Sequence, residues 1–266
     1  MELHYYKVDP TGNITLLITS PVPREVRREV AALLMKREED AEQVGFLEAP
    51  GNSGCVLRLQ MAGGEFCGNA SISAAALYAA RTGVYGSLLI EVSGVDRPVS
   101  IFVSKQGEDF YEGRVSMPLP ECVTEVVLGG KRLPLVRFPG ICHLVNDGTF
   151  TEEFAEQSIA SWCRELNAGA LGVLFTDGMT MKPLVYVCKT RTAFWEHSCA
   201  SGTAALGAYC ALSRGKSGTY SFRQPCGTLS VDAVIENGNI GSLTLCGGAR
   251  ITGCGTLNTA DFGGIQ

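Results

Sequence analysis

The stretches 63-GGEFCGNASISAAALY-78 and 194-FWEHSCASGTAALGAY-209 follow one pattern. In each, a cysteine (Cys67 or Cys199) is followed by small residues and then by an alanine-rich run that ends in a tyrosine. The two cysteines stand 132 positions apart in a chain of 266 residues, so one falls in each half. The pattern predicts an internal duplication that presents one thiol per half.

Further segments repeat at nearly the same spacing. Gly12–Leu16 resembles Gly140–Leu144, and Val44–Glu48 resembles Val173–Asp177. A duplication explains these matches better than chance in an alanine- and glycine-rich chain, because several separate segments keep the same order. The repeat therefore predicts two similar domains.

The repeat also sets the expected domain boundaries. We expect an N-terminal domain at residues 1–116 and a C-terminal domain at 117–248, joined near the proline-containing stretch Ser116–Pro120. A last strand at about 249–260 falls beyond the second repeat, and we expect it to return to the first domain. Two domains of about 130 residues agree with the usual domain size, and a hydrophobic content of 45% is enough for two cores.

Composition narrows the class of partner. A net charge of −5 without a basic cluster argues against nucleic acid and anionic membrane. No apolar run approaches the ~18 residues of a membrane span, and Met1–His4 lacks the features of a signal peptide. We expect a cytoplasmic monomer or homodimer that acts on a small molecule.

Eleven cysteines are many, but their spacing fits neither a disulfide scaffold nor a metal site. The number is odd, and no Cys-x-x-Cys or His-x-x-x-His spacing occurs, so no metal is expected. Most of the cysteines fit small buried hydrophobic residues in a reducing compartment; Cys55, Cys188, Cys210 and Cys246 stand among apolar neighbours.

Strand patterns dominate the chain, and four segments show helical periodicity. The predicted helices are Pro23–Glu39, the almost wholly apolar Ala70–Arg81, a helix that Thr149 caps and that runs through Leu166, and Ala200–Ser213. The predicted strands are Leu3–Val8, Ile14–Thr19, Cys55–Met61, Leu88–Val92, Val99–Val103, Arg114–Met117, Leu133–Phe138, His143–Asn146, Gly172–Thr176, Leu184–Cys188, Thr219–Arg223, Leu229–Ile235, Gly241–Leu245 and Ala249–Leu257. We expect a mixed α/β fold in which each half wraps a strongly curved sheet around one central helix.

Each cysteine stands just before a buried helix, where free N–H groups and the positive end of the helix dipole are concentrated. A thiol in that position is expected to have a lowered pKa and to be partly thiolate near neutrality. A carboxylate held between two such helix ends would have its neighbouring carbon flanked by Cys67 and Cys199. One thiolate would remove a proton while the opposite thiol donates one to the other face, and no cofactor is required.

These motifs resemble the diaminopimelate epimerase and proline racemase superfamily. Cys67-Gly68-Asn69 matches one cysteine motif of the family, and Cys199-Ala200-Ser201-Gly202 matches the other, Cys-Gly-Thr-Gly, with two changes. The resemblance covers essentially the whole chain. It implies a diaminopimelate epimerase-like fold of two pseudo-symmetric halves, an active site between them, and a PLP-independent racemase or epimerase with two catalytic cysteines.

Four further motifs resemble the histidine racemases of staphylopine-type metallophore biosynthesis. They are Pro10-x-Gly12-Asn13-x-Thr15, Glu42–Phe46, Glu65–Ala70 and Trp195-Glu196-x-Ser198-Cys199-x-Ser201-Gly202-Thr203. This resemblance implies conversion of L-histidine to D-histidine, with Glu42 as the candidate that reads the imidazole. The implied substrate-binding residues are Asn13, Glu42, Gln43, Gly68, Asn69, Glu196, His197, Ala200, Ser201, Gly202 and Thr203.

The sequence departs from diaminopimelate epimerases where those enzymes bind substrate. Thr190-Arg191 replaces a Glu-Arg pair, and Ile141 replaces an Asn, which argues against diaminopimelate. His197 would orient Cys199, contact the substrate or cap the helix, and His143 would line the cleft or be a satisfied strand histidine.

Four other functions stay open. The first is a racemase or epimerase of another amino acid, of the diaminopimelate or proline type. The second is an isomerase of the phenazine-biosynthesis type, a class that shares the fold but lacks the cysteine pair. Outside racemisation, the pair would form a dithiol redox switch, or the chain would be a silent amino-acid-binding module. Retention of both cysteines favours the racemase.

Overall fold

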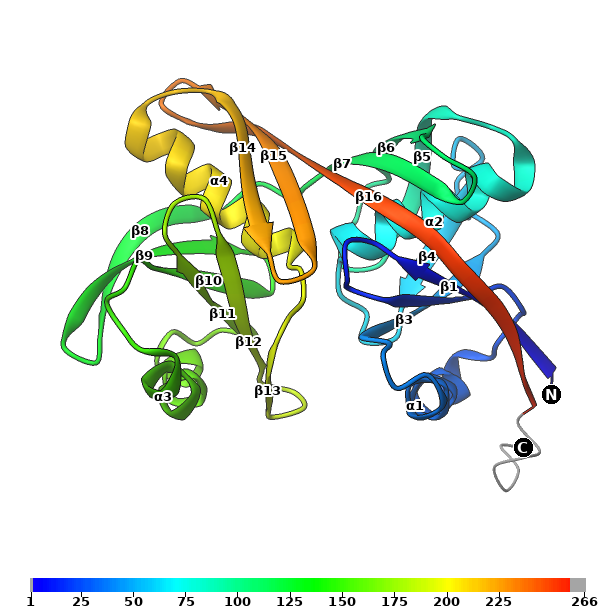
Figure 1. The fold of residues 1–266 in the computed structure, drawn as a ribbon, viewed down its shortest axis with the longest axis horizontal. Coiled ribbons are helices and arrows are strands. Elements are labelled where there is room, and N and C mark those ends of the chain that lie inside the picture. Colours follow the sequence, from blue (N-terminus) through cyan, green and yellow to red (C-terminus); the bar gives the residue numbers. More distant parts are fainter. Residues whose placement is uncertain (1, 259–266) are drawn as a thin grey trace. The chain divides into compact units, whose positions relative to one another are not determined.

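The computed structural model describes residues 2–258, and these form two compact units (Figure 1). Unit 1 comprises the described residues of Met1–Val115 and Gly247–Gln266, and unit 2 comprises Ser116–Cys246. The expected boundaries, after residues 116 and 248, lie within two residues of these. Residues 259 and 260 of the expected last strand lie outside the described part.

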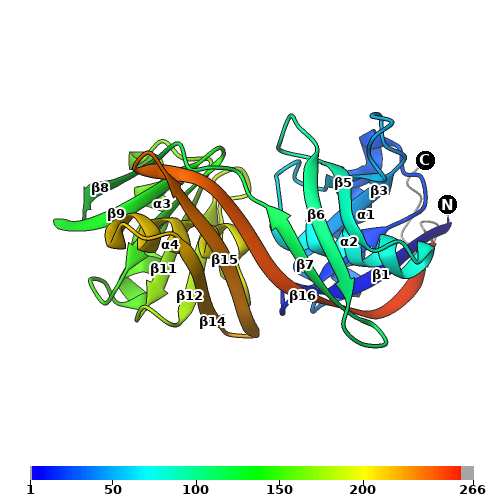
Figure 2. The ribbon, with the colours of Figure 1, turned by 90° about the horizontal axis from the view of Figure 1, so that it is seen from above.

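Unit 1 is a closed sheet of eight strands around a helix. The sheet closes because β1 pairs antiparallel with both β2 and β16. Figures 1 and 2 show the helix α2 (Gly68–Thr82) among these strands. The strands, in sheet order, are β1 (Glu2–Asp9), β2 (Thr15–Ile18), β3 (Gln43–Glu48), β4 (Leu57–Met61), β5 (Gly86–Val92), β6 (Val99–Lys105), β7 (Phe110–Ser116) and β16 (Asn239–Asn258).

The two faces of β2 carry different cores. Leu16 and Ile18 join the apolar cluster that covers α1 (Arg27–Arg37), whereas Thr15 and Leu17 point to the opposite face because side chains alternate along a strand. The surface helix was predicted to run over Pro23–Glu39. It is shorter, because a turn of 3-10 helix at Arg24–Val26 precedes α1.

Small residues allow α2 to lie close to its sheet. A Cβ added at Gly113 of β7 would lie 2.4 Å from a side-chain carbon of Ile72 in α2. The predicted buried helix Ala70–Arg81 is confirmed, and α2 is two residues longer at its start and one residue longer at its end. It ends at Gly83, whose φ of 72° is the left-handed conformation favoured by glycine.

Unit 2 contains a six-stranded sheet and a hairpin that pairs with β16. Two strands of unit 2 were missed: β8 is largely exposed and β13 has only four residues, so neither has a clear apolar pattern. Strand β3 of unit 1 was missed as well. The segments predicted at 241–245 and 249–257 form the single strand β16. The remaining strands are β8 (Cys122–Leu128), β9 (Lys131–Phe138), β10 (Ile141–Asn146), β11 (Ala170–Thr176), β12 (Met181–Val187), β13 (Thr192–Trp195), β14 (Gly218–Gln224) and β15 (Gly227–Glu236).

Two helices cover the two faces of the six-stranded sheet. Leu171 and Val173 of β11 belong to the core beside α3 (Glu152–Glu165), while Leu174 faces α4 (Ala200–Arg214). The central strands are therefore apolar on both faces and show little alternation. Thr149 was the predicted cap of α3, but Thr151 caps it by accepting the Phe154 N–H at 3.3 Å.

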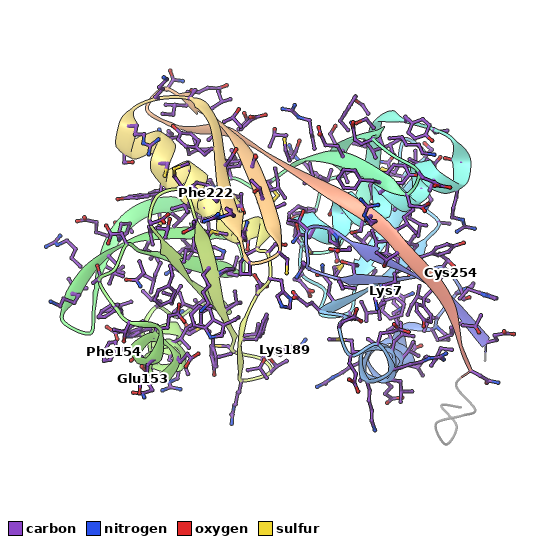
Figure 3. All side chains as sticks on the ribbon, viewed as in Figure 1. Lys7, Glu153, Phe154, Lys189, Phe222 and Cys254 are labelled. Carbon is purple, nitrogen blue, oxygen red and sulfur yellow. The ribbon has the colours of Figure 1, made fainter. Side chains whose placement is uncertain are left out.

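The hairpin of β14 and β15 lies against α4. Figure 3 labels Phe222 of β14 beside α4, and this side chain is 1% exposed. A Cβ at Gly207 of α4 would lie 2.1 Å from a side-chain carbon of Val231 in β15, so this contact also depends on glycine. The buried helix of each unit is thus held by close approach of backbone to side chain.

Candidate active site

Both predicted catalytic cysteines are the N-cap residues of buried 15-residue helices. Cys67 caps α2 with φ −132° and ψ 115°, and Cys199 caps α4 with φ −124° and ψ 110°. The Cys67 sulfur accepts the Ala70 N–H at 3.4 Å, and the Cys199 sulfur accepts the Gly202 N–H at 3.2 Å. Each sulfur therefore lies at the positive end of its helix.

The two helix starts also match in a hydroxyl side chain four residues after each cysteine. Ser71 donates to the Cys67 carbonyl, and Thr203 donates to the Cys199 carbonyl, each at 2.7 Å. Positions 67 and 71 correspond to positions 199 and 203 at the offset of 132. The two helix starts are built alike from backbone outward, which holds each cysteine in one place.

The surroundings of Cys199 keep its proton on the sulfur. Cys199 is 4% exposed, and burial is the largest cause that raises the pKa of its thiol well above the usual value. The charge of Glu196, and the hydrogen bond that this carboxylate accepts, raise the pKa further, whereas Ser201 and Gly202 lower it. The expectation of a lowered pKa is thus wrong for Cys199, because desolvation and a nearby carboxylate outweigh the helix terminus.

A glutamine from a distant strand fixes the backbone at Cys199. The Oε1 atom of Gln224 accepts the Cys199 N–H at 2.7 Å, and its Nε2 atom donates to the Thr203 hydroxyl at 2.8 Å. Gln224 is 4% exposed at the end of β14. Sequence reasoning missed this residue, since it stands 25 positions from Cys199 and no local motif marks it.

A buried histidine lies behind the first turn of α4. The Nε2 atom of His143 lies 3.0 Å from the Ser201 hydroxyl, which in turn lies 3.5 Å from the Cys199 sulfur. Burial lowers the pKa of His143 to about 3, so the ring is neutral near pH 7. Of the two roles considered for His143, the structure shows a fully buried strand histidine in contact with a predicted site residue.

The predicted substrate-binding residues of unit 1 form a polar network. Asn13 donates through Nδ2 to Glu42 Oε2, and Gln43 donates through Nε2 to Asn13 Oδ1 at 2.5 Å and to Thr15 at 2.8 Å. Asn13 and Thr15 are buried. Thr15 lies on the face of β2 opposite the α1 cluster, and β2 contacts α2.

The other predicted residues lie in or just before the same helix starts. Gly68 and Asn69 form the first turn of α2, and Ala200 begins α4; all three are buried. The carbonyl of His197 accepts the Cys226 N–H at 3.3 Å, which ties the segment before Cys199 to the turn between β14 and β15. By contrast, Thr190 and Arg191 are exposed in the turn between β12 and β13.

No group of three or more His, Cys, Asp or Glu side chains within residues 2–258 is arranged to hold a metal ion. Over the same residues, every helix is too short or too polar to cross a membrane.

The comparisons with known proteins agree with this geometry. The family described as "Histidine racemase CntK N-terminal domain" matches residues 2–258. A histidine racemase of Fusobacterium nucleatum is 32% identical over 219 residues, covering 78% of this chain and 81% of that one. A histidine racemase of Staphylococcus aureus is 27% identical over 244 residues, covering 86% and 88%.

Solved structures show the same fold at low sequence identity. A probable proline racemase from Agrobacterium radiobacter K84 aligns with a TM-score of 0.70 at 14% identity, covering 98% of this chain and 94% of that one. The diaminopimelate epimerase-like fold expected from the sequence is confirmed. With the family match over both cysteine-capped helices, the chain belongs to the histidine racemase family of isomerases.

Proposed function

We propose that this protein interconverts L-histidine and D-histidine without a cofactor, with Cys67 and Cys199 as the two acid/base groups. The single observation that carries this proposal is the matched pair of helix N-caps, in which each sulfur accepts a backbone N–H from its own helix. In the proposed reaction one cysteine removes the α-proton, and the other donates a proton to the opposite face of the same carbon.

The surroundings of Cys199 support a division of roles. A two-base reaction needs one thiol and one thiolate at its start. Burial and Glu196 raise the pKa of Cys199, so we assign the proton-donating thiol to Cys199 and the base to Cys67 in the resting enzyme. After turnover the protonation states are exchanged, with Cys67 as thiol and Cys199 as thiolate.

The helix starts also provide donors for the substrate carboxylate. The first N–H groups of a helix have no partner within the helix and favour an anion. We assign the α-carboxylate to the first turns of α2 and α4, with Gly68, Asn69, Ala200 and Ser201 as the N–H donors. Gly202 and Thr203 line the same turn, and their N–H groups bond Cys199. Binding there stabilises the charge that develops when the proton leaves.

We assign recognition of the side chain to the polar network of unit 1. The Asn13 amide donates to Glu42, and Gln43 holds Asn13, so the carboxylate has a fixed orientation. A carboxylate in that position accepts a hydrogen bond from an imidazole N–H. Glu196 and His197 complete the proposed site from the segment before Cys199.

We propose the cellular setting of the reaction from the resemblance to the histidine racemases of metallophore biosynthesis. We place it in the cytoplasm and in the biosynthesis of a staphylopine-type metallophore, for which D-histidine would be supplied. The exposed turn at Thr190 and Arg191 is left outside the proposed site.

Proton exchange in D₂O tests the proposal directly. The reduced protein is mixed with each L-amino acid in turn, and the α-proton signal is followed by NMR. We expect loss of the signal with histidine alone, and no loss in Cys67→Ser or Cys199→Ser. Cys254→Ser is the matched control, since Cys254 is exposed and outside the proposed site, and it should exchange at the unsubstituted rate.

Other outcomes separate the alternatives. Exchange with a different amino acid would keep the two-cysteine mechanism and reject histidine as substrate. Absence of exchange with every amino acid would reject the racemase. In that case, formation of a Cys67–Cys199 disulfide under mild oxidation, detected by mass spectrometry, would favour the dithiol switch.

A further inference from the structure

A chain of three polar groups runs through the interior of unit 2 to the Cys199 sulfur. It begins at His143 on β10, passes the Ser201 hydroxyl at 3.0 Å, and reaches Cys199 at 3.5 Å. His143 is 0% exposed. Space for its ring comes from Gly172, which lies directly opposite on β11, because a Cβ there would lie 2.3 Å from His143 Nδ1.

The two ring nitrogens of His143 have different surroundings. Nε2 faces Ser201, whereas Nδ1 is buried without a hydrogen-bond partner among residues 2–258. A neutral ring carries one N–H, and an unsatisfied buried N–H is rarer in proteins than an unsatisfied acceptor. The proton therefore belongs on Nε2, where Ser201 accepts it.

This tautomer fixes the direction of the whole chain. We propose that His143 is a positioning residue for Cys199: its Nε2–H donates to Ser201, which turns the serine hydroxyl to donate to the Cys199 sulfur. Under the proposed function, that hydroxyl stabilises the thiolate that remains when Cys199 has given its proton to the α-carbon. The bonding electrons stay on sulfur, and no proton moves along Ser201 or His143.

In unit 1, the strand pair equivalent to the one that holds His143 carries different side chains. Thr15 of β2 lies opposite Gln43 of β3 in the same parallel register as His143 opposite Gly172. The large side chain is on the second strand in unit 1 and on the first strand in unit 2. Gln43 donates to Thr15 and Asn13 there, so that network serves the predicted substrate-binding residues, while the His143 network serves the cysteine.

The Ser201 hydroxyl is the second hydrogen-bond donor to the Cys199 sulfur, after the Gly202 N–H. It opposes the effect of Glu196 on the pKa of Cys199. Glu196 is the charged group that acts on Cys199, and it favours the thiol; the Ser201 hydroxyl and the Gly202 N–H favour the thiolate. A sulfur that must alternate between acid and base needs both influences. His143 is the group that keeps Ser201 pointing the right way.

The alkylation rate of Cys199 tests the inference without any substrate. The full-length reduced protein is treated with iodoacetamide at fixed pH, and the Cys199 and Cys254 peptides are quantified by mass spectrometry, with Cys254 as internal control. Ser201→Ala should slow alkylation of Cys199 about tenfold, because a hydrogen bond to a charged group is lost. Ser201→Thr keeps the hydroxyl and should stay within about twofold.

The direction in which the alkylation rate of Cys199 changes in the variants decides between the inference and its alternatives. His143→Phe should also slow alkylation of Cys199, by a smaller factor than Ser201→Ala. Unchanged or faster alkylation in Ser201→Ala would overturn the inference, since Cys199 would then donate to Ser201 or not interact with it. A merely structural role would lower the melting temperature of these variants without slowing alkylation.

NMR of the unsubstituted protein gives a test that needs no variant to fold. In ¹⁵N-histidine-labelled protein, we expect a protonated Nε2 and an unprotonated Nδ1 for His143. A protonated Nδ1 would overturn the inference. Both measurements are made without histidine, so a failure of the proposed reaction and a failure of this inference are seen separately.

Discussion

The starts of α2 and α4 share a backbone and differ in what surrounds it. Both cysteines are N-caps, both accept an N–H three residues later, and both have a hydroxyl donor on the cysteine carbonyl. Cys67 is partly exposed, whereas Cys199 is buried. The comparison teaches that the helix start sets where a sulfur lies, and that its neighbours set whether it keeps its proton.

The clearest difference stands three residues before each cysteine. Position 196 carries a glutamate that raises the pKa of Cys199, and the equivalent position 64 carries a glycine with φ 80°. A second difference is the brace on the preceding segment. Ser93 donates to the Glu65 carbonyl before Cys67, while Gln224 accepts the N–H of Cys199 itself.

Replacing either cysteine tests whether the two helix starts are equally necessary. Cys67→Ala and Cys199→Ala should each reduce histidine racemisation by about 10³-fold, since each removes one of two proton carriers. Chiral chromatography of histidine after incubation measures the loss. If one variant kept more than a tenth of the activity, a single-base reaction would replace the two-base account.

The pH dependence of stability tests the neutral state of His143. Its pKa is about 3 in the folded protein against 6.5 ordinarily, so the unfolded chain binds a proton below pH 6.5 that the folded chain does not. The contribution of the neutral ring to the free energy of unfolding is therefore fully present above pH 6.5. As the pH falls from 6.5 to 5, the free energy of unfolding should decrease by about 2 kcal/mol.

His143→Phe is the control for this slope, because phenylalanine does not titrate. Urea unfolding at both pH values should show a smaller decrease in the variant. Equal decreases in the two proteins would contradict a neutral, buried His143.

Glu196→Gln makes the surroundings of Cys199 more like those of Cys67. Removing the carboxylate charge should lower the pKa of Cys199, so its alkylation by iodoacetamide should rise about tenfold at fixed pH. Glu65→Gln is the matched control before Cys67, and Cys199 should react in it at the unsubstituted rate. A slower reaction of Cys199 in Glu196→Gln would argue against this role.

Removal of the Gln224 side chain tests how strongly it holds the backbone at Cys199. Gln224→Ala leaves the buried Cys199 N–H without a partner and removes one donor to the Thr203 hydroxyl, which still donates to the Cys199 carbonyl. We therefore expect a loss of about 1–3 kcal/mol in unfolding free energy. Urea denaturation measures it. Ser93→Ala is the comparison in unit 1, and a loss there with none in Gln224→Ala would reverse the assignment of the tighter brace.

The sequence predicted the features that local patterns encode. The apolar helices after Cys67 and Cys199 were predicted because small and apolar residues run through both. Strand β13 was missed, since a four-residue exposed strand has too short a pattern. Capping-box spacing favours Thr149 as the cap of α3, yet the helix starts at Glu152 and the Thr151 side chain accepts the Phe154 N–H.

The chemistry of Cys199 required the tertiary structure. The helix terminus alone predicts a lowered pKa, and only burial with Glu196 reverses the sign. Gln224 and His143 stand 25 and 56 positions from Cys199, and they reach it through strands whose pairing no local motif reveals. Position in sequence identified the cysteines, and long-range packing set their properties.

The isotope content of early product tests the central claim most directly. L-histidine is incubated with the protein in D₂O, the reaction is stopped at a few percent conversion, and both enantiomers are separated and analysed by mass spectrometry. Two monoprotic cysteines on opposite faces predict deuterium at the α-carbon of the D-histidine and protium in the recovered L-histidine. Protium in the D-histidine, or deuterium in the recovered L-histidine, would contradict two-base racemisation by Cys67 and Cys199.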